Sequence, residues 1–147
     1  MKKMINKVSE KGLTLVEILA SIFLVSIILS AFFSFFIQSA KTGKTSEEVV
    51  DGTYIAQGEM EKVYEISRKG DLTYGIDEIV NRLSYEQLPP TTPNEHIFST
   101  TQEEFYIKLK LKDHSYPGMS YLVIEVFKQG NGTRPRAKME TILEWGS

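Results

Sequence analysis

Residues 11–40 read KGLTLVEILASIFLVSIILSAFFSFFIQSA, and this stretch decides the fold. Glu17 is the only charged residue between Lys11 and Lys41. An ionised carboxylate costs at least a few kcal/mol when it enters hydrocarbon. We therefore expect the Glu17 carboxylate to be protonated, held at the membrane interface, or paired with a cation.

The apolar run has the length of a membrane-spanning helix. Residues 13–37 would extend roughly 37 Å as an α-helix, at about 1.5 Å per residue, and a bilayer core is about 30 Å thick. A secretory signal has a shorter apolar core of about 7–15 residues, and residues 37–40 (IQSA) make a poor signal-peptidase site. The four lysines at positions 2, 3, 7 and 11 place the N-terminus in the cytoplasm and the C-terminal domain outside.

The basic leader, Gly12, the apolar Leu13 and the glutamate at Glu17 together resemble the class III signal of type IV prepilins and pseudopilins. The resemblance implies cleavage between Gly12 and Leu13 by a prepilin peptidase, followed by N-methylation of Leu13. It also implies that Glu17 neutralises the N-terminal ammonium of a neighbouring subunit during assembly. Two departures are that leucine replaces the usual phenylalanine at Leu13 and that the span has no helix-kinking proline.

The function implied by the resemblance is that of a minor pilin or pseudopilin, a structural subunit without enzymatic activity. Its fibre would belong to a type IV pilus, a type II secretion system or a competence system for DNA uptake, and the sequence does not choose among them. The implied partners are the membrane, the prepilin peptidase, other pilin subunits and the assembly platform. The alternative is an extracytoplasmic binding module on a permanent membrane anchor, in which Glu17 is incidental.

Composition limits the rest of the chain to one small domain. The 147 residues carry a formal charge of -2 and no cysteine, so disulfides and thiolate chemistry are excluded. The leader holds four lysines and one glutamate, which leaves the mature chain near -5. We expect a leader at residues 1–12, a transmembrane helix at 13–37 and an extracytoplasmic domain at 38–147.

Hydrophobic periodicity predicts an α+β fold, a long helix followed by a small antiparallel sheet, which is the pilin-like architecture that the resemblance implies. The helix should continue to about residue 69 with Val49, Ala56, Met60, Val63 and Ile66 on or near one face, and the likeliest breaks are at Gly43, Gly52 and Gly58. Residues 70–75 read as a loop, 77–87 as a short helix, and the prolines at 89–93 end that helix. The alternating pattern then predicts three antiparallel strands, at 105–112, 120–128 and 138–145.

The remaining polar residues predict no catalytic, cofactor or metal site. His96 and His114 lack nearby ligand-spaced carboxylates, and the acid pairs Glu47–Glu48 and Glu103–Glu104 are expected to be solvated. The alternating Lys108, Lys110 and Lys112 could touch DNA backbone, but they more simply form the solvent side of a strand and guard its edge. Ser26, Ser30 and Ser34 are either a helix-packing stripe or hydroxyls bonded to their own helix.

Overall fold

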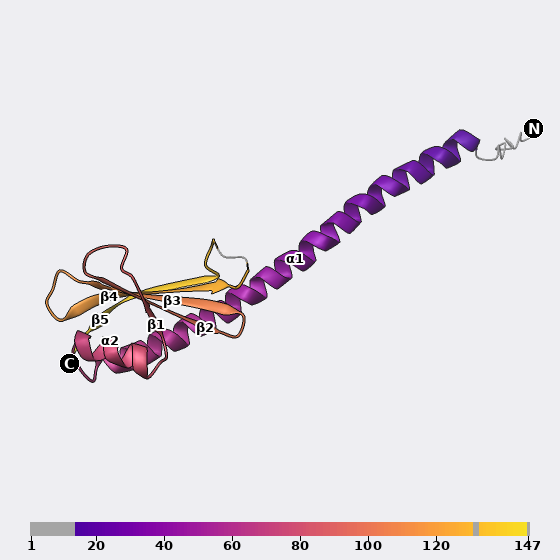
Figure 1. The fold of residues 1–147 in the computed structure, drawn as a ribbon. Coiled ribbons are helices and arrows are strands. Elements are labelled where there is room, and N and C mark those ends of the chain that lie inside the picture. The colour runs from indigo at the N-terminus through magenta and orange to yellow at the C-terminus, as the bar shows by residue number, and fades with distance from the viewer. Residues whose placement is uncertain (1–13, 131–132, 147) are drawn as a thin grey trace, which may run out of the picture. The chain divides into compact units, whose positions relative to one another are not determined.

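The computed structural model describes residues 14–130 and 133–146 (Figure 1). Two helices precede five strands: α1 (Leu15–Ser67), α2 (Leu72–Asn81), β1 (Glu86–Leu88), β2 (Glu95–Gln102), β3 (Phe105–Asp113), β4 (Met119–Lys128) and β5 (Ala137–Glu144). Internal contacts divide the chain into two compact units, Met1–Gly43 and Lys44–Ser147. Gly12 and Leu13 lie outside the described residues.

Helix α1 is continuous over 53 residues, so the prediction that the apolar helix continues into the following region is confirmed. None of Gly43, Gly52 and Gly58 interrupts it. Gly52 has a packing role, because a Cβ there would lie 3.2 Å from Cβ of Arg136. Glycine thus allows the α1 backbone to approach the segment that leads into β5.

The part of α1 in the Lys44–Ser147 unit buries a stripe of residues spaced three or four apart, the spacing of one helix face. Ala56, Val63 and Ile66 are buried as predicted, and Met60 is half-buried. Val49 is 41% exposed and lies beside the buried stripe, not in it. The neighbouring Glu48 takes the buried position instead.

Helix α2 begins five residues earlier than predicted, at Leu72, because Asp71 caps it. The Asp71 carboxylate accepts a hydrogen bond from the Tyr74 N–H at 2.9 Å. The loop expected at 70–75 is therefore wrong from Leu72 onward, and the helix ends at Asn81 instead of extending to 87. Gly75 lies in this helix against the indole of Trp145, where a side chain would not fit.

The five strands form one antiparallel sheet in the order β1-β2-β3-β4-β5, so the expectation of three strands is corrected. Predicted strands at 105–112, 120–128 and 138–145 correspond to β3, β4 and β5. Strand β2 lacks the alternation of a half-buried strand, because Ile97, Phe98 and Ser99 are all buried. Strand β1 has only three residues, too few for a period-two pattern.

The core lies between one face of the sheet and the two helices. Its fully buried strand residues alternate along β3 and β4, as predicted for β3, and are joined by Ile66 of α1 and Ile79 of α2. At the end of the sheet, the Trp145 indole N–H donates a hydrogen bond to Ser120 Oγ at 3.0 Å. This buried bond satisfies the one polar atom of a large apolar ring.

Candidate functional site

The N-terminal turn of α1 holds Glu17, the charged residue on which the assembly prediction depends. Thr14 precedes the helix, and its Oγ1 accepts a hydrogen bond from the Glu17 N–H at 3.3 Å. The Thr14 carbonyl accepts bonds from the N–H groups of Glu17 and Ile18 at 2.9 and 3.2 Å. Thr14 is therefore the N-cap of the helix.

The place of Glu17 in the first turn after Thr14 suits a local role in helix capping that was not predicted above. Residues 14–17 (TLVE) match the capping-box pattern of Ser or Thr followed three residues later by Glu or Gln. A carboxylate in the first turn also interacts favourably with the positive end of the helix dipole. Glu17 can thus stabilise the start of α1 without any partner subunit.

The Glu17 carboxylate has no salt bridge to any described residue of its own chain. Between Glu17 and Lys41 the helix carries no other charge. If this turn enters hydrocarbon, the carboxylate needs either a proton or a cation from outside the described residues. Gly12 and Leu13, the predicted processing residues, lie outside the described part of the chain, so their geometry is not defined.

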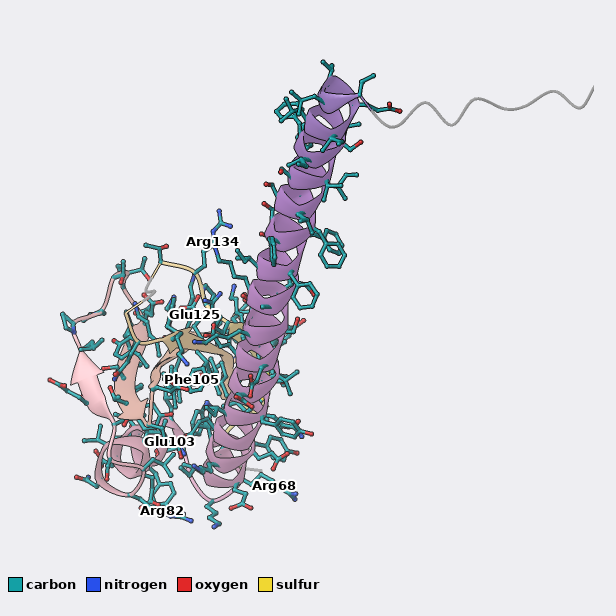
Figure 2. The ribbon with its side chains drawn as sticks, turned by 90° about the vertical axis from the view of Figure 1, so that its right-hand side faces the viewer. Arg68, Arg82, Glu103, Phe105, Glu125 and Arg134 are labelled. Atoms are coloured by element: carbon teal, nitrogen blue, oxygen red, sulfur yellow. The ribbon has the colours of Figure 1, made fainter. Side chains whose placement is uncertain are left out.

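The apolar segment that follows Glu17 is exposed on every side of the helix. Phe23 is 67% exposed and Phe35 is 75% exposed, and apolar side chains project all around this part of α1 (Figure 2). In the described part of the chain, α1 is the helix that is long and apolar enough to cross a membrane. Its side chains therefore have the composition that a lipid environment requires.

The serines of this segment bond within the helix. The hydroxyls of Ser26, Ser30 and Ser34 donate to the carbonyl groups four residues earlier at 2.8, 2.8 and 2.9 Å. This confirms the interpretation that each hydroxyl bonds to the preceding turn, which makes a polar group tolerable in lipid. A second helix packed on this stripe stays a prediction.

The basic strip on β3 faces away from the core but does not lie on a sheet edge. Strand β3 pairs with β2 on one side and β4 on the other, so the edge-guard interpretation of its lysines is wrong. Lys110 forms an ion pair with Glu125 at 2.8 Å, and Glu95 lies opposite Lys112 in the register. These acids neutralise part of the positive charge that a DNA backbone would need.

Of the acid pair Glu47–Glu48, which was predicted to be solvated, only Glu47 is exposed. Glu47 is exposed, whereas Glu48 is buried and lies 3.0 Å from Arg136 Nε and 3.7 Å from Lys128 Nζ. Lys128 also contacts Glu104 at 2.6 Å, and this hydrogen bond raises the Lys128 pKa. These ion pairs hold the ends of β4 and β5 against α1.

A second buried carboxylate, Glu59, joins α1 to the segment before β1. The Tyr85 hydroxyl donates to Glu59 at 2.8 Å, and Lys62 contacts the same carboxylate at 2.6 Å. Burial raises the pKa of the Tyr85 hydroxyl, and the negative Glu59 raises it further. Neither buried acid could be found from the sequence, because each lies in a helix that carries many solvated charges.

The two histidines do not share a site. His96 is on β2, and His114 follows β3. The His114 ring stacks on Tyr116 and contacts Tyr121, while its Nδ1 accepts a hydrogen bond from the Tyr116 N–H at 3.0 Å. Among residues 14–130 and 133–146, no three His, Asp or Glu side chains are grouped closely enough to hold a metal ion.

Comparisons of this chain with protein families, curated proteins and solved structures find no match.

Proposed function

We propose that this chain is a minor pilin or pseudopilin, a structural subunit of a type IV pilus, a secretion fibre or a DNA-uptake fibre. One observation carries the proposal: the exposed apolar part of α1 begins beside a carboxylate that has no cationic partner among the described residues. A fibre subunit would account for the exposed apolar surface and for the carboxylate at its start. The apolar surface would be held first by lipid and then by neighbouring helices, and the Leu13 ammonium of a neighbour would neutralise Glu17.

Two further features support this proposal. The sequence before α1 has four lysines and the Gly12–Leu13 step, which suit a cytoplasmic leader and its removal. The same helix then continues into an α+β unit with its own core. We propose that the N-terminus is cytoplasmic and that the Lys44–Ser147 unit faces outward.

Processing tests the proposal directly. The full chain is expressed with and without an active prepilin peptidase and measured by intact mass. We expect loss of the first twelve residues, an N-terminal Leu13 carrying a methyl group, and poor cleavage of Gly12→Ala, in which a Cβ obstructs the scissile bond. Recovery of only the full-length chain beside a matched peptidase that cleaves a control prepilin would contradict the proposal.

The second candidate function is a binding module on a permanent membrane anchor. The position of Glu17 in the first turn of α1, after the N-cap Thr14, favours it, because a carboxylate there interacts favourably with the helix dipole and needs no fibre. An uncleaved chain that stays membrane-bound would support this alternative.

A further inference from the structure

A pocket of about 420 Å³ lies where the turn between β3 and β4 meets the start of α2. Three separate parts of the chain line it: the first residues of α2, the turn at residues 113–120, and the residue that follows β5. All three belong to the Lys44–Ser147 unit. We call it the Tyr116 pocket and define it by Asp71, Asp113, His114, Tyr116 and Trp145.

The ring of Tyr116 offers the pocket an aromatic surface in a fixed orientation. One face of this ring stacks on the His114 ring, with 5.5 Å between the centroids and 18° between the planes. The His114 ring in turn contacts Tyr121, with 4.6 Å between the centroids. Tyr116 is nevertheless 68% exposed, so the other face of its ring is open. An aromatic ring that is already held in place loses little conformational entropy when a ligand covers it.

The hydrogen bonds of the turn fix the charge of the His114 ring. Its Nδ1 accepts a hydrogen bond from the Tyr116 N–H at 3.0 Å. A backbone N–H can only donate, so Nδ1 carries no proton and the imidazole is in its neutral form. His114 therefore supports the Tyr116 ring without adding positive charge to the pocket.

The charged groups of the pocket are both negative. Asp71 and Asp113 line it, and its described lining residues include no lysine or arginine. Both aspartates are exposed, and neither forms a salt bridge with another described residue. Lys69 and Lys112 are close to them in sequence, but they do not line the pocket. A cleft lined by charge of one sign concentrates ligands of the opposite sign.

An organic cation suits this lining better than a metal ion does. In the part of the chain that the structure describes, no three His, Asp or Glu side chains are grouped closely enough to hold a metal. A quaternary ammonium group needs no such ligand set, because it binds over the face of an aromatic ring. Tyr116 supplies the open ring, and the two carboxylates balance the charge.

We propose that the Tyr116 pocket binds a small organic cation with a quaternary ammonium group, of which choline is the simplest probe. The methyl groups of the ammonium would lie against the ring of Tyr116, between Asp71 and Asp113. The proposal concerns the Lys44–Ser147 unit alone. A fibre subunit and a permanently anchored module would carry the same pocket.

Titration of the full chain with choline tests the proposal. Trp145 is the only tryptophan of the chain and lines the pocket, so its fluorescence reports on binding. The protein is held in a maltoside detergent, which has no ammonium group, and calorimetry repeats the titration without using the fluorophore. The matched control ligand is the neutral isostere of choline, in which a carbon atom replaces the nitrogen.

We expect saturable binding of choline and at least tenfold weaker binding of the neutral isostere. Calcium chloride at the same ionic strength as sodium chloride should not displace choline. Absence of saturable choline binding by both methods, equal affinity for the two ligands, or displacement by calcium would overturn the proposal.

A second probe, choline phosphate, separates two sources of the ammonium group. Its phosphate would face the aspartates, so we expect it to bind more weakly than choline, which assigns the free cation as the ligand. Binding as tight as that of choline would support the same pocket with a choline-bearing headgroup or polymer as the source.

Asp71→Asn with Asp113→Asn tests the role of charge. Asparagine is as good an N-cap as aspartate, so α2 should keep its capping bond to the Tyr74 N–H while the pocket loses both charges. The affinity for choline should fall about tenfold. Glu86→Gln with Glu103→Gln removes two exposed acids outside the pocket and should bind choline like the parent. An unchanged affinity in the aspartate variant would overturn the proposal.

Two substitutions of Tyr116 test the aromatic surface. Tyr116→Phe keeps the ring and should bind choline like the parent, whereas Tyr116→Leu keeps an apolar side chain without the ring and should bind about tenfold more weakly. Equal affinity in Tyr116→Leu and Tyr116→Phe would contradict the proposal. Every titration uses the purified, uncleaved chain, so its outcome is independent of leader cleavage and fibre assembly.

Discussion

At the scale of single residues, we propose two roles for Glu17, helix capping and charge pairing in a fibre, that one substitution can separate. In Glu17→Gln the capping pattern with Thr14 is kept but the charge is lost. In Glu17→Ala the capping pattern and the charge are both lost. Both variants should insert into the membrane more readily, by a few kcal/mol. If Glu17 pairs with a neighbour's ammonium, both should lose fibre recovery, because an uncompensated buried charge costs about 3–5 kcal/mol.

The measurement for Glu17 is recovery of sheared fibres from Glu17→Gln, Glu17→Ala and the parent chain at equal membrane levels. Normal recovery in Glu17→Gln with reduced recovery in Glu17→Ala would mean that this residue only caps the helix. The permanently anchored module would then be the better account.

The raised pKa of the Tyr85 hydroxyl predicts how the stability of the protein depends on pH. Burial and Glu59 raise the pKa of the folded-state hydroxyl above the unfolded value of about 10. Above about pH 10 the unfolded chain therefore loses a proton that the folded chain keeps, and the free energy of unfolding falls by about 1.4 kcal/mol per pH unit. Tyr85→Phe should remove this component of the fall.

The check is urea unfolding of the full chain in detergent from pH 7 to pH 11.5. At pH 7, Tyr85→Phe should be less stable by about 1–2 kcal/mol, because the buried Glu59 loses a donor. Tyr121→Phe, on the exposed face of β4, is the control and should follow the parent at pH 7. Parallel pH curves for Tyr85→Phe and the parent would refute the buried Tyr85–Glu59 bond as the cause.

At the scale of secondary-structure elements, glycines in the two helices have opposite roles. A Cβ at Gly75 would lie 2.2 Å from the indole of Trp145, so Gly75→Ala should separate α2 from the sheet and destabilise the protein by about 1–3 kcal/mol. Gly58→Ala meets open space and should stabilise α1 by about 0.5–1 kcal/mol. The midpoints of urea unfolding in detergent measure the stability changes of both variants. A stabilising effect of Gly75→Ala would contradict the packing of α2 against Trp145.

The ion pairs of the Lys44–Ser147 unit also act between elements. Glu48 of α1 meets Arg136 and Lys128, which lie at the ends of strands far from it in sequence. Glu59 meets Tyr85 across 26 positions. Such contacts fix where α1 lies against the sheet, because each would leave a buried charge if the helix slid by one turn.

At the scale of the whole molecule, the lysine asymmetry predicts topology. Protease added to intact protoplasts should digest the Lys44–Ser147 unit and spare a tag placed before Lys2, because positive residues are retained on the cytoplasmic side. A tag that is digested while the C-terminal unit survives would contradict both the pilin and the anchored-module proposals. Lysed protoplasts are the control for protease access to both ends.

Local pattern was enough to predict several elements of this protein. An uninterrupted apolar run forces a helix, since the backbone must satisfy its own hydrogen bonds in lipid, and residues 105–112 alternate because only one face of β3 meets the core. The same logic fails for β2, where Ile97 and Phe98 are buried on opposite faces and no alternation remains. It also fails for β1, which is too short to show a period.

The apolar helix, the lone Glu17 and the charge balance can be read from the amino-acid sequence, because they depend on residue type and spacing along one chain. The burial of Glu48 and Glu59, the place of the Lys108–Lys112 strip in the middle of a sheet, and the contrast between packed Gly52 and open Gly58 become visible only in the folded structure. Those properties depend on which distant segments meet. A helix repeat places Glu48 and Val49 only about 100° apart, and the position of Arg136 decides which of them faces inward.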